Sequence, residues 1–591
     1  MTDFYIAKSD GSSPGGVTGS DSNDGLTPST PKATLDAIIQ ISGDADTDGD
    51  NIFFYGGTYT DSDLNSTNNS NQVASISDAN KRQHSLIAYL DQEVIFRRGG
   101  ASSTFAFIRF FNLSLAPQDN FKISGIKFID SDTDIGAGKL TNAVLAFYEG
   151  EVSASATPTV TIENCTFEFS DTTFGRGIIL IDDQTSKDGN EIPYVINNCT
   201  FTLTGSDPDI AVIKSTVMFG STSSVTFTNN TVTVTHTGSG DAGDPLVDFG
   251  TLGSSSDVTV AVDTGGSVTV ANNTFDITSG TDSATWEVIK CTGTKDINIT
   301  SNSFDVKQSE TSAGEMKVIQ VDADPGTAKT HTIEISGNNF KIDEKRGYGV
   351  YIRADNDYSE LNGNCRVTNN KVIGVDDFNT LSASGTGIYV QEVNSPTISQ
   401  NVLRNHYDGI LVNGCATPVI TDNILEDVGD DGDDAFAAVG LFVTNSSGGT
   451  IKRNKFIQSF NSNRTNGTSI RIDTHPGFTL SDNIFILKKL NSANSYRYFR
   501  CNDASGVNNS QFGGSATAST FSGNVYVNTA NNPNTGSSIA RAGSDSNVPI
   551  ADYKAHVDPT AKYDPAMLTQ NLTKELSKSF LTEEVINIRE F

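Results

Sequence analysis

Three polar residues that could do acid–base chemistry alternate in the stretch SIRIDTHPGF, residues 469–478. Arg471, Asp473 and His475 are each separated by one residue. Because successive side chains of a β-strand point to opposite faces, these three would project from one face. The arginine could clamp a carboxylate, the aspartate could act as an acid and the histidine could shuttle a proton. The same alternation also describes the ordinary solvent-facing side of a strand.

An aromatic and cationic cluster follows, at residues 496–500. Tyr496, Tyr498 and Arg500 alternate in the stretch YRYFR. Tyrosine has an apolar ring with a hydroxyl at its edge, and arginine donates paired hydrogen bonds to carboxylates. The cluster therefore predicts contacts with a saccharide, and a purely structural role is the alternative.

Alternating carboxylates near the N-terminus resemble part of a calcium loop. Asp44, Asp46, Asp48 and Asp50 are each one residue apart, with a glycine before the last. Calcium loops place oxygen ligands at such alternate positions and glycine at the bend. The twelfth position is Tyr55, so the bidentate glutamate that closes such loops is missing. The sequence predicts a partial calcium site, with a solvated acidic turn as the alternative.

Composition limits the partners of the chain. Its 591 residues include 40 Lys and Arg against 71 Asp and Glu, a formal charge of -31, which disfavours a polyanion such as DNA. The N-terminus has no basic and apolar export signal, and no run of about eighteen apolar residues predicts a membrane span. We expect a protein that acts inside a cell, leaves by lysis, or has lost a signal. The six cysteines form no CxxC pair, so we expect buried free thiols.

A short phrase, polar-Asn-apolar-apolar, recurs along most of the chain. Between Phe128 and Tyr526 it returns on average about every 33 residues, which indicates a repeat architecture. Cys165 and Cys199 occupy the Asn position in two early copies. If repeats stack, identical Asn side chains lie above one another and hydrogen-bond along a ladder. The predicted ladder consists of Asn230, Asn273, Asn302, Asn338, Asn370, Asn401, Asn423, Asn454, Asn483 and Asn524.

These repeats predict an all-β fold: a single-stranded parallel β-helix of about 13 or more rungs. Gly387, Gly409, Gly440 and Ser469 each begin a strand 14 residues before a ladder Asn, so two strands and the turn between them keep a constant length. We expect an N-terminal capping helix within residues 30–41 and a C-terminal helical cap beginning at 564–565. The predicted segments are 1–60, the cap and first strand, 61–540, the β-helix, and 541–591, the C-terminal cap or tail.

The opening stretch, from FYIAKSDGSS through GSDSNDGLTPSTPKATLDAI to GDNIFFYGGTY, resembles that of the pectate-lyase-like right-handed parallel β-helix proteins. The resemblance implies a right-handed coil. Proteins of this fold include polysaccharide lyases, glycoside hydrolases, uronan epimerases, phage tailspikes and structural shafts. The Gly-His-Gly and Arg-Ile-Lys motifs of polygalacturonases are missing, and the Lys-bearing strand of alginate and dermatan lyases has no clear copy.

Three functions remain open at this point. The first is a virion appendage, a phage tailspike or fibre that binds host cell-surface polysaccharide, either as a homotrimer or attached to other virion proteins. The second is a secreted, extracellular polysaccharide lyase or uronan epimerase whose signal has been trimmed. The third is a structural surface protein without catalysis. All three fit a repeat fold, and a glycan partner fits the first two.

Overall fold

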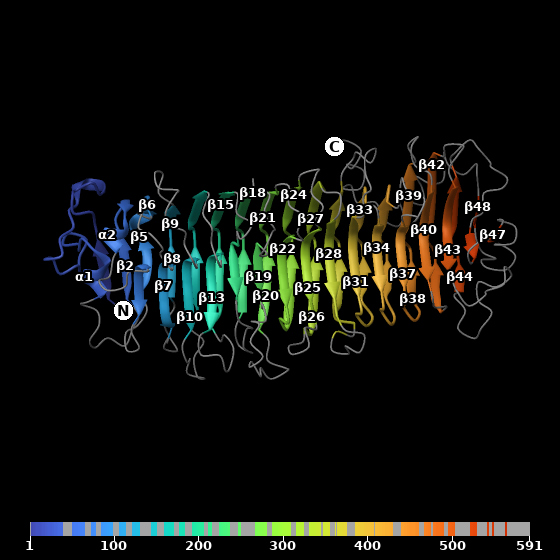
Figure 1. Cartoon of the computed structure of the whole chain (residues 1–591), viewed down its shortest axis with the longest axis horizontal. Helices are drawn as coiled ribbons and strands as arrows, with labels where there is room; N and C mark the ends of the chain where they lie inside the picture. The colour runs from blue at the N-terminus through green and yellow to red at the C-terminus, as the bar shows by residue number, and fades with distance from the viewer. Residues whose placement is uncertain are drawn as a thin grey trace. The chain divides into compact units, whose positions relative to one another are not determined.

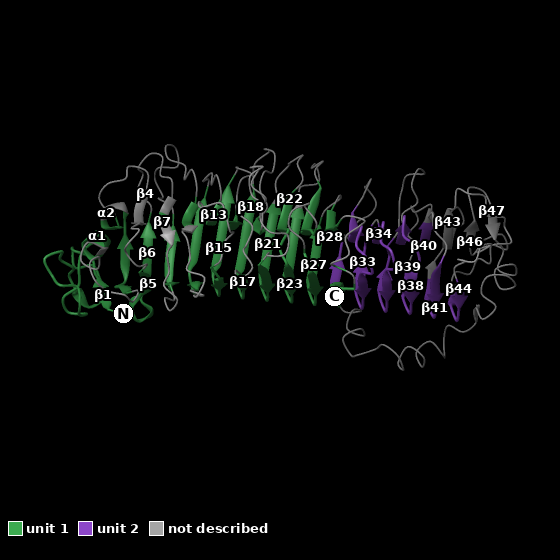
Figure 2. Cartoon of the chain, turned by 90° about the horizontal axis from the view of Figure 1, so that it is seen from below, with its two compact units in different colours: residues 1–370 green, residues 371–591 purple. Residues whose placement is uncertain are grey.

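The computed structural model covers the whole chain, and two compact units divide it: unit 1, Met1–Asn370, and unit 2, Lys371–Phe591 (Figure 2). The residues that the structure describes are 2–39, 50–64, 72–77, 84–97, 106–113, 121–129, 143–149, 159–170, 177–183, 192–205, 211–215, 224–236, 246–249, 266–279, 286–308, 315–323, 330–343, 347–354, 361, 363–374, 385–406, 408–428, 439–459, 466–473, 477–489, 495–502, 520–528, 540–542, 546–548 and 562–563.

Each coil of the chain contributes one strand to each of three parallel sheets, here named A, B and C (Figure 1). Among the described residues, complete coils run from β2 to β28 in unit 1 and from β32 to β46 in unit 2. Strands that are one coil apart pair in parallel and in register, as between β17 and β20. The predicted right-handed parallel β-helix is confirmed, and its rungs exceed the expected minimum.

The strands of unit 1 belong to the three sheets as follows. Sheet A contains β1 (Asp3–Ile6), β2 (Asn51–Phe54), β5 (Ser85–Ala88), β8 (Phe121–Ser124), β11 (Val160–Glu163), β14 (Tyr194–Asn197), β17 (Ser224–Thr228), β20 (Ser267–Ala271), β23 (Asp296–Thr300), β26 (Thr332–Ser336) and β29 (Cys365–Thr368). Sheet B contains β3 (Gly57–Tyr59), β6 (Val94–Arg97), β9 (Ile126–Ile129), β12 (Thr166–Ser170), β15 (Thr200–Gly205), β18 (Thr231–His236), β21 (Thr274–Ser279), β24 (Ser303–Gln308) and β27 (Asn339–Asp343). Sheet C contains β4 (Gln72–Ser77), β7 (Ala106–Leu113), β10 (Ala143–Glu149), β13 (Gly177–Asp183), β16 (Ile213–Ser215), β19 (Val247–Phe249), β22 (Trp286–Thr292), β25 (Met316–Asp322) and β28 (Gly347–Arg353).

Unit 2 repeats the arrangement. Its sheet A contains β32 (Thr397–Ser399), β35 (Val419–Thr421), β38 (Gly449–Lys452), β41 (Phe478–Ser481) and β44 (Thr520–Ser522). Its sheet B contains β30 (Lys371–Ile373), β33 (Val402–Arg404), β36 (Ile424–Glu426), β39 (Lys455–Ser459), β42 (Ile484–Lys489), β45 (Val525–Asn528) and β48 (Lys562–Tyr563). Its sheet C contains β31 (Thr386–Gln391), β34 (Asp408–Asn413), β37 (Val439–Thr444), β40 (Asn466–Asp473), β43 (Ser495–Asn502), β46 (Ala540–Ala542) and the antiparallel β47 (Ser546–Val548).

The helices among the described residues are short and lie at the N-terminal end. They are the 3₁₀ turns η1 (Pro14–Gly16) and η2 (Tyr89–Asp91) and the α-helices α1 (Leu35–Ile39) and α2 (Asp61–Leu64). The predicted N-terminal helix is thus present as α1, with Leu35 and Ile38 fully buried. The predicted helix after residue 564 lies outside the described residues. Within the described part of the chain, none of the helices has the length and apolar character of a membrane span.

The ladder of unit 1 satisfies the buried polar atoms of its members. The Oδ1 of Asn302 accepts hydrogen bonds of 2.9 Å from both the backbone N and the Nδ2 of Asn273. The Nδ2 of Asn302 in turn donates to Val270 O at 2.9 Å and to Asn338 Oδ1 at 3.0 Å. This pattern links Asn230, Asn273, Asn302, Asn338 and Asn370 through one turn between sheets A and B. The predicted ladder is confirmed in this unit.

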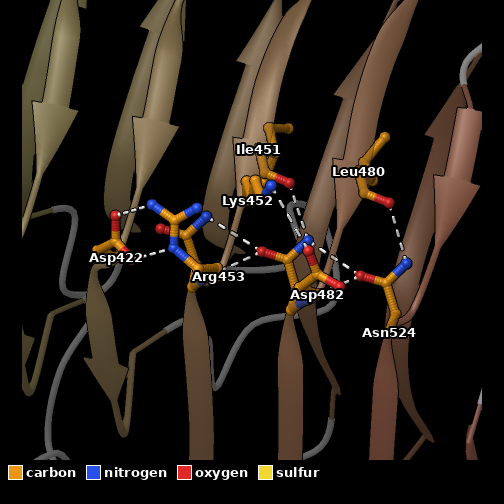
Figure 3. A network of polar contacts seen from close by, with 9 residues as sticks. Asp422, Ile451, Lys452, Arg453, Leu480, Asp482 and Asn524 are labelled. Atoms are coloured by element: carbon orange, nitrogen blue, oxygen red, sulfur yellow. Dashed lines mark hydrogen bonds and ion pairs between the residues drawn. The ribbon is translucent and has the colours of Figure 1, made fainter. Parts of the chain in front are cut away.

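A second ladder in unit 2 links Asn401, Asn423, Asn454, Asn483 and Asn524 in the same way. The residue before each ladder Asn has a positive φ, as at Asp422 and Arg453, and this left-handed residue turns the chain from sheet A into sheet B. Figure 3 shows that Arg453 donates to the Asp422 carboxylate through Nε and Nη2, at 2.6 Å each. This pair raises the pKa of Arg453 and adds an exposed charged row outside the buried amides.

Aromatic anchors stack inside the coil one turn apart. Phe128, Phe167 and Phe201 have ring centroids 5.0 and 4.9 Å apart with interplanar angles of 5° and 3°. In unit 2 the rings of Phe485 and Tyr526 stack at 4.9 Å. These rings are buried, so the aromatic residue of the repeated phrase packs in the core.

The glycines that begin the strands of sheet C in unit 2 lie at a tight contact between rungs. A Cβ on Gly409 would come within 2.4 Å of the Gly440 carbonyl oxygen and 2.7 Å of Leu425 Cδ2. Gly387 and Gly440 face similar contacts. The register of paired residues leaves out this position between consecutive rungs, and we call it the kink position of sheet C.

The five cysteines whose side chains the structure describes are free and buried, which agrees with the expectation; they are Cys165, Cys199, Cys291, Cys365 and Cys415. Cys165 and Cys199 occupy ladder positions, and the backbone N of Cys199 donates to Asn230 Oδ1 at 2.8 Å. Each thiol contacts a backbone carbonyl, Ile123 O for Cys165 and Ile162 O for Cys199. A thiol therefore fills the place of the amide at the early rungs of the ladder.

Candidate functional site

The outer face of sheet C in unit 2 carries two neighbouring columns of partly exposed side chains. In-register pairing between consecutive rungs defines both. The first column, here called the ring column, contains Tyr389, Leu411, Phe442 and Arg471. The second, the amide column, contains Gln391, Asn413 and Thr444. Every one of these side chains is half-buried, so each keeps some surface in solvent.

On the last two rungs of the ring column, a cationic side chain stacks on an aromatic ring. The Cζ of Arg471 lies 4.5 Å from the centroid of the Phe442 ring, one rung away. Such a stack holds the guanidinium plane while leaving its edge able to donate hydrogen bonds. A partly exposed guanidinium in this position can bind a carboxylate or sulfate in two-pronged fashion.

On the first rungs of the two columns, polar side chains form a hydrogen-bonded network. The Tyr389 hydroxyl donates to Gln391 Oε1 at 3.0 Å and accepts from Asn413 Nδ2 at 3.4 Å. Gln391 Nε2 donates to Glu392 Oε1 at 3.2 Å, and Asn445 Nδ2 donates to Asn413 Oδ1 at 2.9 Å. The amides are thereby held in fixed orientations beside an aromatic ring. Rings flanked by oriented amides match the alternating apolar and hydroxyl-bearing surfaces of a sugar.

Two of the predicted site clusters lie on adjacent strands. Arg471 and Asp473 are two positions apart on β40. Tyr496, Tyr498 and Arg500 are in β43, where Arg500 is the register partner of Arg471 and Tyr496 that of Gly467. Tyr498 lies opposite the kink position of Ser469, which the pairing skips. His475 lies outside the described residues, so the three-residue catalytic prediction stays a prediction.

Sheet C of unit 1 carries a charged group that the sequence analysis missed. Asp248 of β19 is paired in register with Lys214 on one side and Lys290 on the other, and only 1% of Asp248 is exposed. Burial raises the pKa of the neighbouring Cys291 thiol, and the charge of Asp248 raises it further. The register thus places a buried carboxyl group between two lysine-bearing strands.

The predicted calcium ligands are only partly described. Asp44, Asp46 and Asp48 lie outside the described residues. Asp50 is buried, and its carboxylate accepts a 2.6 Å hydrogen bond from the backbone N of Thr2 and lies 3.9 Å from Nδ1 of His84. The described residues hold no group of three or more His, Cys, Asp or Glu arranged for a metal ion. Calcium binding therefore stays a prediction.

One sequence signal could have found the ring column. Tyr389, Leu411, Phe442 and Arg471 are each the third residue of a repeated quartet, GIYV, GILV, GLFV and SIRI. Because the second and fourth residues of each quartet are buried, the third must face outward. The Lys214, Asp248 and Lys290 column gives no such signal, because the loops between its strands differ in length.

No protein-family model and no curated protein sequence matches the chain. Solved structures that match include a double mutant of a periplasmic alginate epimerase, with 10% identity, a TM-score of 0.28 and coverage of 87% of this chain and 85% of that one. The A-module of a mannuronan C-5 epimerase from Azotobacter vinelandii matches with 9% identity, a TM-score of 0.24 and coverage of 90% and 95%. A complex of XylC with xylose has 11% identity, a TM-score of 0.21 and coverage of 92% and 86%. Likenesses at this level say nothing about activity.

Proposed function

We propose that this protein binds a cell-surface polysaccharide along the outer face of sheet C in unit 2, and that it does so as a virion appendage of the tailspike or fibre kind. The observation that carries the proposal is the pairing of the ring column with the amide column on consecutive rungs. Both columns run along the coil axis, so a polymer laid along that axis would meet an aromatic, amide or guanidinium group at each rung, about every 4.8 Å. The polymer class we favour carries carboxylates, because a guanidinium such as that of Arg471, stacked on Phe442, binds a carboxylate through two parallel hydrogen bonds.

Equilibrium titration of the purified protein with neutral, uronate-bearing and sulfated polysaccharides tests this proposal. We expect binding of a uronate-bearing polymer, and we expect Arg471→Ala and Phe442→Ala to weaken it about tenfold each, or about 1.4 kcal/mol. The matched control is Arg366→Ala, which removes the same charge from an exposed position on sheet A. Equal losses in Arg366→Ala and Arg471→Ala would show that only overall charge matters, and the site proposal would fail.

The virion setting has its own test. We expect the protein to sediment as a trimer and to slow adsorption of a phage to cells that display the bound polymer. A monomer that binds no cell-surface glycan would argue against this setting.

The alternative, a polysaccharide lyase or uronan epimerase, draws on one arrangement: the half-buried Lys214 and Lys290 on the two strands that flank the buried Asp248. A lyase removes the proton beside the uronate carboxylate and expels the glycosidic oxygen, which leaves a carbon–carbon double bond in the product. A neutral lysine could take that proton, and a charged lysine could neutralise the carboxylate.

Ultraviolet absorbance decides between a lyase and a binding protein. Growth of absorbance during incubation with uronate polymers, abolished in Lys290→Ala and retained in Arg366→Ala, would establish the lyase. For an epimerase, proton exchange into the polymer from deuterated water is the corresponding measurement. Absence of both reactions, together with tight binding, supports the appendage.

A further inference from the structure

An unusual apolar surface lies at the N-terminal end of unit 1. Among the described residues, two large hydrophobic side chains are clearly exposed: Leu90, at 73%, and Leu26, at 49%. Each of them follows a residue that contacts Tyr5. Leu26 follows Gly25, whose carbonyl accepts a 2.8 Å hydrogen bond from the backbone N of Tyr5, and Leu90 follows Tyr89, whose ring lies 5.6 Å from that of Tyr5.

The residues that precede the two leucines adjoin a cluster of aromatic rings on the outer face of sheet A. The ring of Tyr5 stacks on Phe53 with centroids 5.5 Å apart, and Tyr89 meets both rings edge-on. Tyr55 packs against Tyr89 at 4.6 Å, and its hydroxyl donates to Pro28 O at 2.9 Å. Tyr55 is buried, so we call Leu26, Leu90 and the half-buried rings of Tyr5, Phe53 and Tyr89 the N-terminal patch.

The patch is confined to the first rungs. Tyr5, Phe53 and Ile87 pair in register and give way to Ser124 and Glu163 at the next positions of the same column. Further along unit 1 the column continues with Asn197, Thr228, Ala271 and Thr300, which are small or polar. Beyond Ile87 this column of outward positions is thus polar or small, whereas at the N-terminal end it carries large apolar and aromatic side chains.

The backbone that displays Leu90 is strained. Leu90 and Asp91 have φ values of +49° and +55°, in the left-handed region that side chains such as leucine rarely adopt. The turn is fixed by Gln92, whose backbone N donates to Tyr89 O at 3.1 Å and whose Oε1 accepts from Gly56 N at 2.7 Å. Strain that places a leucine in solvent costs stability without any gain in packing, and such outliers gather at functional surfaces.

Carboxylates surround the patch. Asp3, Asp24 and Asp91 are exposed and stand beside Tyr5, Leu26 and Leu90 in the chain. Hydrogen bonds from Thr30 and from the backbone of Leu26 hold the pKa of Asp24 below its usual value, so it stays charged. Two copies of this patch facing each other would bring these acidic groups together, because a symmetric contact pairs like with like. An acidic rim instead complements a basic partner.

We propose that the N-terminal patch docks a segment of a different protein in which apolar side chains are flanked by lysine or arginine. Leu26, Leu90 and the rings supply the apolar contact, and Asp3, Asp24 and Asp91 select the basic flanks. The proposal does not depend on the glycan site, because that site lies on sheet C of unit 2 and the patch lies on sheet A of unit 1. For a virion appendage, such a contact would be the point of attachment.

The test uses the full chain and two labelled synthetic peptides of equal length, one alternating leucine with lysine and the other alternating leucine with glutamate. Fluorescence anisotropy should show at least about tenfold tighter binding of the leucine–lysine peptide. The double variant Leu26→Ser/Leu90→Ser keeps all charges of the protein, so it keeps any unspecific attraction. We expect it to lose at least about tenfold in affinity, the effect of removing two contacts with large apolar side chains.

Two further variants sharpen the result. Leu90→Asn places a residue that tolerates positive φ at the strained position, so it should raise the melting temperature while weakening peptide binding. Asn298→Ala, an exposed change on another rung of sheet A, should alter neither. Fluorescence of Trp286, the one tryptophan in the sequence, reports that each variant is folded.

Two outcomes would overturn the proposal. Equal binding of the leucine–lysine peptide by the wild type and by Leu26→Ser/Leu90→Ser would show that the patch takes no part. Sedimentation of the wild type as an oligomer that dissociates in the double variant would assign the patch to a second copy of this chain.

Discussion

The guanidinium of Arg471 stacks on the ring of Phe442 from the neighbouring rung, with its Cζ 4.5 Å from the ring centroid. The stack fixes the orientation of a side chain that otherwise has many rotamers, so less entropy is lost when the guanidinium binds an anion. Arg471 therefore contributes a fixed orientation as well as a positive charge, in a protein whose formal charge is -31.

Lysine in place of Arg471 separates charge from geometry. Arg471→Lys keeps the positive charge but loses the planar fork, so uronate-polymer affinity should fall about tenfold, or about 1.4 kcal/mol. Titration calorimetry measures the change, with Arg366→Lys on sheet A as the matched control. Unchanged binding by Arg471→Lys would mean that an ammonium suffices and that the stack is incidental.

An asparagine of the ladder should contribute more to the unfolding free energy than an asparagine on the surface. Asn302→Ala removes the acceptor of two buried donors of Asn273 and the donor to Val270 O. Because each buried group left without a partner costs about 1–3 kcal/mol, we expect a loss of about 3 kcal/mol in unfolding free energy. Asn298→Ala, on the exposed face of the same rung, should cost less than about 0.5 kcal/mol. Urea unfolding followed by Trp286 fluorescence compares the two, and equal midpoints would refute a structural ladder.

The sequence predicted the fold well because stacking repeats the same physical demand at every rung. A buried turn needs an amide that both donates and accepts, so Asn recurs at Asn302 and Asn338 whatever the neighbouring loops do. The site was harder to predict. An outward position such as Tyr389 has no required residue type, and register with Phe442 two rungs later follows only once the strands are paired. Asp248 illustrates the limit, because its register partners Lys214 and Lys290 are known only once the strands are paired.

The kink position of sheet C should not tolerate a side chain at Gly409. In Gly409→Ala the new Cβ would lie 2.4 Å from the Gly440 carbonyl oxygen and 2.8 Å from Val428 Cγ1. The backbone oxygen cannot rotate away, so we expect a destabilisation of about 3 kcal/mol, at the upper end for overpacking. Thermal unfolding followed by circular dichroism measures it. Val419→Ala, at a half-buried position on sheet A, is the control and should cost less than half as much. A melting temperature like that of the wild type would show that the rungs can separate locally.

The buried side chain of His406 leads us to expect that acid destabilises unit 2. Burial lowers the pKa of His406 to about 4, and its Nε2 lies 3.3 Å from Val372 O. In the unfolded chain a histidine takes up a proton near pH 6.5, whereas the folded chain resists protonation until about pH 4. The contribution of the neutral, buried ring is therefore complete above pH 6.5 and is lost as the pH falls from 6.5 towards 4. The shift corresponds to about 3 kcal/mol.

Urea unfolding at several pH values, with wild type and His406→Gln compared, isolates this contribution. Glutamine can donate to Val372 O but does not titrate, so any fixed cost of the substitution is the same at every pH. We expect the wild type to lose about 3 kcal/mol more than the variant between pH 6.5 and 4, because carboxylates elsewhere in the chain titrate equally in both proteins. Parallel stability curves across that range would mean that the His406 ring is already protonated, or reached by water, in the folded protein.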